Sequence, residues 1–157
     1  MTPEKILEMI VTEIRQFALT SPLNRFPDGG HYFGEPLIGV AAGDNPLFAL
    51  FKDAVGSFHW LPEEVMELAG LGASGTQLSV ISWVLPVSMA ARESNRNERR
   101  FPSREWALTR NFGEIFNSGL RSHVVEWLRS NGISAAAPQL VKGWRQINDT
   151  PKGIASS

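Results

Sequence analysis

The chain contains no cysteine among its 157 residues. Disulfides, thiolate zinc sites, iron–sulfur ligation and cysteine nucleophiles are therefore excluded from this polypeptide. It also has no apolar run near the ~20 residues that a membrane-spanning helix requires, and its first residues lack the basic and then apolar pattern of a secretory signal. We therefore expect a cytoplasmic protein that makes no membrane contact.

Positive and negative side chains nearly balance, with a formal net charge of −1. This balance argues against a nucleic-acid-binding protein whose whole surface is basic, so any contact with nucleic acid must be local. Arginines are concentrated only between Arg92 and Arg104. This segment fits either a solvated loop or a local contact with phosphate. His31, His59 and His123 are scattered without metal-ligand spacing, so we expect no metal site.

Length and hydropathy pattern predict one α+β domain over residues 1–157. A chain of this length can bury roughly two-thirds of its unfolded surface in one core. Apolar periodicity and the prolines and glycines between segments predict the early elements. These are a helix at 3–19, a strand at 37–42, a helix from Pro46, a helix from Pro62 and a strand at 79–85. The turn 43–46 before the second helix also fits an anion-holding helix start.

A long helix at about 103–130 is the best-specified element. Ser103 suits its N-cap, and an apolar stripe follows at positions 108, 112, 115, 116, 120, 124 and 128. Gly113 and Gly119 each cost about 1 kcal/mol relative to alanine, which indicates a bend or a close contact. Gly132 suits the left-handed position that ends a helix.

The surroundings of this helix predict a βαβ-like unit. A charged loop is expected at 92–100 and a second strand at 133–138. The architecture is then a small mixed sheet packed against several helices, with the long helix between two strands; half of a nitroreductase-like domain also fits. In this arrangement Val80, Ile81 and Val84 would pack on the helix, and an unfilled cleft would lie near Arg110.

Recognisable catalytic motifs are missing, so the catalytic residues are unknown. The sequence has no phosphate-binding loop of the Gly-x-x-x-x-Gly-Lys-Ser/Thr type, no Gly-x-Ser-x-Gly elbow and no Gly-x-Gly-x-x-Gly after a strand. The remaining candidate for a site combines three neighbouring features: a basic loop, a helix start rich in aromatic residues, and a segment of small residues that ends in Pro138. The helix start, residues 103–112, reads SREWALTRNF.

With these features the stretch from Leu78 to Pro138 resembles the N-terminal catalytic half of the epoxyqueuosine reductase family and its ferredoxin-like relatives. The resemblance implies an oxidoreductase that binds a corrinoid (cobalamin) and draws electrons from two 4Fe-4S clusters to reduce a modified tRNA nucleoside in queuosine biosynthesis. The family's cysteines lie beyond the matched region. We therefore expect the front portion of a longer iron–sulfur protein, inactive alone and partnered by a C-terminal ferredoxin-like domain.

The resemblance also implies site residues. Trp106, Arg110, Asn111 and Phe112 would line the cofactor cleft, and Arg99 and Arg100 would contact a phosphate of the cofactor or of tRNA. Where the family places an acidic proton donor before the final proline, this chain has alanine at 135–137. Because alanine cannot transfer a proton, this departure favours a divergent relative acting on another substrate, tRNA or a small molecule.

Two other functions stay open from the residues alone. The chain could be a complete, non-catalytic binding or interaction domain, which predicts a closed core and no apolar face. It could also be a flavin-dependent reductase of nitroreductase-like architecture, although no flavin phosphate site is recognisable. An exposed apolar surface and a cleft near Arg110 would favour the corrinoid-linked enzyme.

Overall fold

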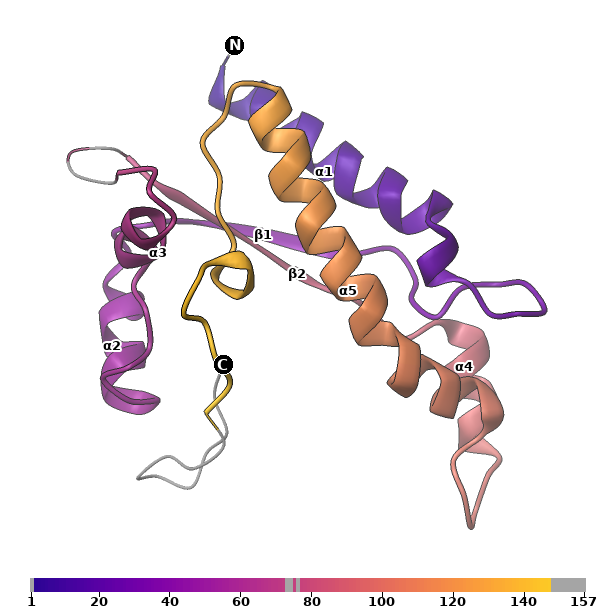
Figure 1. Ribbon diagram of the computed structural model, residues 1–157. Helices are drawn as coiled ribbons and strands as arrows, with labels where there is room; N and C mark the ends of the chain where they lie inside the picture. Colours follow the sequence, from indigo (N-terminus) through magenta and orange to yellow (C-terminus); the bar gives the residue numbers. More distant parts are fainter. Residues whose placement is uncertain (1, 73–74, 76, 148–157) are drawn as a thin grey trace. The chain divides into compact units, whose positions relative to one another are not determined.

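The computed structural model describes residues 2–72, 75 and 77–147, and over these residues the fold is α+β, as the sequence predicts. Five α-helices and two strands follow one another, with two short 3-10 helices (Figure 1). They are α1 (Pro3–Thr20), η1 (Pro22–Asn24), β1 (Leu37–Ala42), α2 (Pro46–Ala54), α3 (Pro62–Leu68), β2 (Ser79–Val84), α4 (Met89–Arg96), α5 (Arg104–Ser130) and η2 (Pro138–Leu140). A search of the described helices finds none with the length and apolar character needed to cross a membrane.

The sheet is simpler than expected. It has two antiparallel strands, β1 and β2, and is not mixed. The strand expected at 133–138 is wrong: residues 133–137 belong to no strand, and Pro138 opens η2. Alanine has low β propensity and proline has no N–H for a ladder, so the segment forms no strand pairing. The long helix therefore follows the sheet and does not connect two of its strands.

The chain divides into two compact units. Unit 1 consists of Met1–Gly39 and Trp83–Val124, and unit 2 consists of Val40–Ser82 and Val125–Ser157. Unit 1 contains α1, α4 and most of α5. Unit 2 contains α2, α3 and the last turns of α5.

The core of unit 1 lies where α1 runs alongside α5 (Figure 1). Ile14, Phe116 and Leu120 are completely buried there. The ring of Phe17 stacks on Phe116, with centroids 6.1 Å apart, and on His123, at 4.3 Å. His123 also lies 2.6 Å from a carboxylate oxygen of Glu13, measured from Nε2. Apolar packing and one polar contact therefore fix the two helices against each other.

The C-terminal end of α1 is closed by Asn24. The carbonyl of Ala18 would normally accept from the N–H of residue 22, but Pro22 has none. Asn24 supplies the missing donor through Nδ2, 2.9 Å from that oxygen. The same amide binds the backbone of Phe33 twice: Nδ2 donates to its carbonyl at 3.2 Å, and Oδ1 accepts its N–H at 2.9 Å. Asn24 is 1% exposed, so one buried side chain fixes both the helix end and Phe33.

A helix, α4, occupies most of the charged segment that we expected to be a loop. Ser88 caps it, because Ser88 Oγ accepts the N–H of Ala91 at 3.4 Å. Ala91 is completely buried against Phe26 and Tyr32. The sequence-based expectation was wrong because this one small apolar contact, made over a long sequence distance, anchors an otherwise charged helix.

The start of α5 is fixed by its neighbours in unit 1. Ser103 caps it, as expected, and its Oγ accepts the N–H of Trp106 at 3.2 Å. The end of α4 holds Ser103 in place: Asn95 Oδ1 accepts its N–H at 3.0 Å, and the hydroxyl of Ser94 lies 2.8 Å from its hydroxyl. Arg104 also donates to a carboxylate oxygen of Asp28 at 2.9 Å. That hydrogen bond lowers the pKa of Asp28.

The buried stripe of α5 differs in part from the predicted one. Phe116, Leu120, Val124 and Leu128 are buried, whereas Phe112 and Ile115 are 42% and 53% exposed. Both internal glycines allow close packing. A Cβ at Gly113 would lie 2.6 Å from the ring of Phe33, and one at Gly119 would lie 2.8 Å from Leu23 Cδ1. Of the two explanations considered for these glycines, the structure supports the close contact.

Unit 2 joins α2 and α3 through a partly buried ion pair, Lys52 Nζ to Glu64 Oε1, at 2.9 Å. Burial alone would raise the pKa of Glu64, but the hydrogen bond from the Leu61 N–H and the Lys52 ammonium outweigh it and lower that pKa. Asn45 caps α2 by accepting the N–H of Leu47 at 3.0 Å. The whole of α2 buries no residue, and its Leu47, Leu50 and Phe51 are 57%, 54% and 42% exposed.

Candidate functional site

A pocket of about 300 Å³ lies in unit 1, on residues from α5, from the end of β2 and from the segment after it. Its lining combines apolar and polar residues. The lining residues are Phe33, Trp83, Leu85, Val87, Thr109, Arg110, Gly113, Glu114 and Asn117. This volume is at the lower end of the range for small-molecule sites, roughly 300–1,000 Å³.

The apolar wall is positioned by the backbone around Phe33. Asn24 holds the N–H and the carbonyl of Phe33, and Phe33 pairs with Val87 in an isolated antiparallel bridge. The ring of Phe33 stacks on Phe116 of the core, with centroids 5.8 Å apart, and passes over Gly113. The wall is therefore an extension of the core of unit 1.

Trp83 joins the strand side of the pocket to α5. Its indole Nε1 donates to Asn117 Oδ1 at 3.0 Å. Asn117 Nδ2 in turn donates to a carboxylate oxygen of Glu114 at 3.1 Å. Glu114 also receives Arg121, whose guanidinium lies 3.4 Å away and whose side chain is only 13% exposed. This chain of contacts orients Trp83 and commits Asn117 and Glu114 to partners within the protein.

Arg110 is the only cation in the pocket lining. No hydrogen bond or ion pair joins its guanidinium to any residue in the described part of the chain. Thr109, its neighbour, uses its hydroxyl hydrogen on the carbonyl of Glu105, at 2.8 Å. The pocket thus presents one uncommitted positive charge beside an aromatic and aliphatic wall.

The structure brings one of the expected cofactor residues, Arg110, into this pocket. Trp106 lies one turn earlier on the same face of α5 and is half-buried, but it is not part of the lining. Asn111 and Phe112 are exposed and also lie outside the lining, and the ring of Phe112 stacks at 6.3 Å on Tyr32. Their roles in a cofactor cleft remain predictions.

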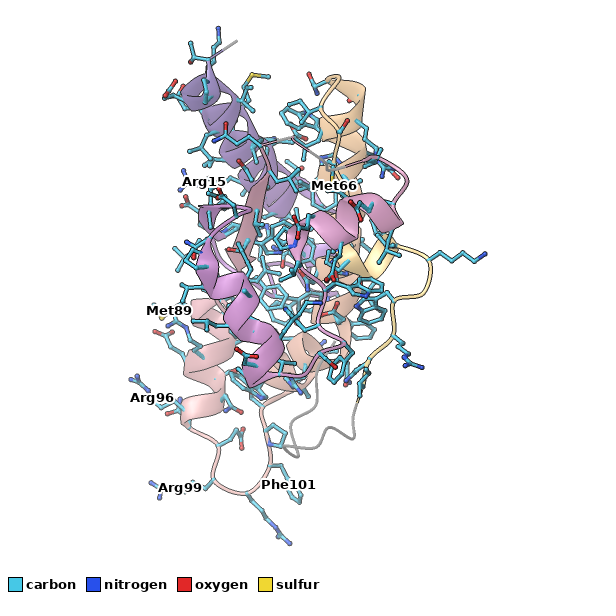
Figure 2. The ribbon with its side chains drawn as sticks, turned by 90° about the vertical axis from the view of Figure 1, so that its left-hand side faces the viewer. Arg15, Met66, Met89, Arg96, Arg99 and Phe101 are labelled. Carbon is cyan, nitrogen blue, oxygen red and sulfur yellow. The ribbon has the colours of Figure 1, made fainter. Side chains whose placement is uncertain are left out.

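Arg99 and Arg100 lie in the exposed loop between α4 and α5, outside the pocket lining. Figure 2 shows the side chain of Arg99 projecting from this loop, and Arg96 projecting from α4. The guanidinium carbon of Arg100 sits 5.3 Å from the centroid of the Phe101 ring. That they contact a phosphate remains a prediction.

Trp83 and Asn117 were missed by the sequence reasoning, which named Val80, Ile81 and Val84 as the face that packs on α5. Val84 is instead 62% exposed. The side chains of a strand alternate between its two faces, so Trp83 and Val84 cannot both face α5. The available signal was the indole N–H of Trp83 within a predicted strand, because a buried Trp N–H usually finds an acceptor.

Comparisons with family models, curated proteins and solved structures give no match to this chain. The functional argument therefore rests on the chain's own residues and geometry. Within the part of the chain that the structure describes, no three His, Asp or Glu residues are grouped so that they could hold a metal ion.

Neither of the two cofactors implied by the family resemblance fits this chain completely. Iron–sulfur clusters do not fit, because they are held by cysteine thiolates and the chain has no cysteine. A corrinoid as a whole does not fit either, because its ring is larger than a pocket of about 300 Å³. Arg110, Thr109 and the Trp83 wall are the residues that would contact its edge.

Proposed function

We propose that this chain supplies the corrinoid-holding part of an epoxyqueuosine reductase-like oxidoreductase, with the iron–sulfur clusters bound by cysteines outside it. The observation that carries the proposal is the pocket at Arg110, which lies in the helix start where the sequence resembles the family. When bound, a corrinoid would supply a cobalt centre that passes electrons to the substrate. The residues of this chain would bind and orient it.

Two further observations support the proposal. First, α5 is one unbroken helix of 27 residues, so Trp106 and Arg110 share a face, although only Arg110 lines the pocket. Second, α2 has no fully buried residue and exposes Leu47, Leu50 and Phe51. Exposed apolar side chains of this kind are typical of interaction surfaces.

The substrate is left open within this proposal. Alanine at 135–137, where the family has an acid, favours a divergent enzyme that reduces something other than the tRNA nucleoside. The pocket's one carboxylate, Glu114, is already paired with Arg121, so it does not replace that acid in the present geometry.

A titration of the purified chain with hydroxocobalamin tests the proposal. We expect a saturable change in the visible absorption spectrum of the corrinoid. A parallel titration with flavin mononucleotide, followed by flavin fluorescence, should show no binding. An unchanged corrinoid spectrum at high micromolar ligand would contradict the proposal, and saturable flavin binding would favour the nitroreductase-like alternative.

A further inference from the structure

The C-terminal end of α5 is followed by the one Asn-Gly dipeptide of the sequence, Asn131–Gly132. Both residues are exposed. In such a pair the backbone nitrogen of the glycine can attack the side-chain amide of the asparagine, because glycine has no side chain to block a close approach. This chemistry depends neither on the pocket at Arg110 nor on the function proposed above.

In the folded chain, the two reacting groups are both committed to the helix. The N–H of Gly132 donates to the carbonyl of Arg129 at 3.0 Å. The side chain of Asn131 turns back along α5, where its Nδ2 donates to the carbonyl of Trp127 at 2.9 Å. The nitrogen that would attack is therefore held by one turn of the helix, and the amide that it would attack is held by the same turn.

The closed end of α5 is a local structure. The N–H of Ile133 donates to the carbonyl of Leu128 at 3.0 Å, and Gly132 has φ +76°, which together form the Schellman type of helix ending. Leu128 is buried, but residues 129–132 are all exposed. Exposed helix ends open at a small free-energy cost without unfolding of the rest of the protein. Opening of this one turn therefore releases both reacting groups.

We propose that Asn131 is a site of spontaneous deamidation that the closed end of α5 restrains. When the turn opens, the nitrogen of Gly132 gives its proton to water and forms a bond to Cγ of Asn131. The bond from Cγ to Nδ2 breaks, and that nitrogen takes a proton from water and leaves as ammonia. Water then opens the five-membered succinimide at either of its carbonyls, so residue 131 becomes aspartate or isoaspartate.

The product cannot rebuild the same helix end. A carboxylate oxygen does not donate to the carbonyl of Trp127, as Nδ2 does, and its negative charge lies at the negative end of the helix dipole. Isoaspartate also adds a methylene to the main chain, which displaces the Gly132 N–H from the carbonyl of Arg129. The modification is therefore a one-way change that loosens the last turn of α5.

Incubation of the whole chain at mildly alkaline pH tests the proposal, in buffer and, in parallel, in enough urea to unfold it. Samples taken over time are digested with trypsin and analysed by mass spectrometry. The peptide 130–142, between the cleavage sites at Arg129 and Lys142, contains Asn131 as its only asparagine. Replacement of its amide NH₂ by OH gives a defined mass increase, and fragment spectra distinguish Asn131 from Gln139.

Two controls separate this site from general amide hydrolysis. Asn131→Gln keeps an amide donor, but its longer side chain would have to close a six-membered ring, which is much slower. Asn111 is an internal control in the same digest, because it is exposed and is followed by Phe112. Asn131→Asp reproduces the charge of the product, and hydrogen exchange measures how fast its helix end opens.

We expect deamidation of Asn131 in urea and a rate about tenfold or more lower in buffer, where the turn is closed. Asn131→Gln and Asn111 should stay unmodified over the same time. The N–H groups of Gly132 and Ile133 should exchange faster in Asn131→Asp than in the unmodified chain. No deamidation in urea would overturn the site, a rate in buffer as high as in urea would overturn the restraint by the helix end, and unchanged hydrogen exchange would overturn the loosening.

Discussion

Replacing Asn24 with alanine tests whether this buried amide holds the end of α1 and the wall of the pocket together. The substitution removes three hydrogen bonds, to the carbonyls of Ala18 and Phe33 and from the N–H of Phe33. The carbonyl of Ala18 cannot turn to the N–H of residue 22 instead, because Pro22 has none. At about 1 kcal/mol for each lost bond, the free energy of unfolding should fall by about 3 kcal/mol.

Urea unfolding followed by far-UV circular dichroism measures this loss. The matched control is Asn97→Ala, which removes an exposed side chain whose contact with the Glu93 carbonyl is long, at 3.4 Å. It should cost no more than about 0.5 kcal/mol. A loss below about 1 kcal/mol for Asn24→Ala, or equal losses for the two variants, would refute the argument from unsatisfied backbone groups.

Asn24→Asp gives an independent check of the same contacts. Aspartate keeps the oxygen that accepts the N–H of Phe33, but its second oxygen faces two carbonyls where Nδ2 now donates. A buried charge without a donor is costly, so at neutral pH this variant should be less stable than Asn24→Ala. The deficit should shrink as the pH falls and the new carboxyl becomes protonated. Equal stability of the two variants at neutral pH would contradict the assigned orientation of the amide.

Three further predictions follow from the contacts. Gly113→Ala should gain about 1 kcal/mol of helix propensity but lose more by overlap with the Phe33 ring, for a net loss of about 1 kcal/mol in urea unfolding; a stabilised variant would contradict the close contact. Gly132→Ala should cost about 1 kcal/mol, because Gly132 has φ +76° at the end of α5, and Gly132→Asn, which tolerates that conformation better, should cost less. Because the pKa of Glu64 is lowered in the fold, its stabilising contribution is complete above about pH 5 and is lost as the pH falls through the lowered pKa. Glu64→Gln should therefore lower the unfolding free energy at neutral pH by less than about 1 kcal/mol, and by less still in acid, once Glu64 is protonated in the folded protein; an equal effect at neutral and acid pH would contradict the ion pair with Lys52.

The apolar surface of α2 and the pocket at Arg110 bear on function in different ways. The pocket is a defined site, in which most polar side chains have an identified hydrogen-bond partner. The exposed apolar side chains of α2 identify no partner. For this reason the corrinoid titration addresses the pocket.

The sequence alone determined the elements whose signals lie within a few residues. Pro3 and a 3.6-residue apolar period specify α1, Ser103 caps α5, and Gly132 ends α5 in a left-handed conformation, all close to their predicted positions. Such signals are local, because a cap or a helical turn depends on neighbours three or four residues away.

Only the tertiary structure decided which side chains form the site. Trp83 meets Asn117 across 34 positions of sequence, and Asn24 holds Phe33 against a core that α1 and α5 build together. The helix in the charged segment after Ser88 is also a long-range outcome, since it depends on the burial of Ala91. Contacts between distant residues depend on how whole elements pack, and no short sequence pattern encodes that packing.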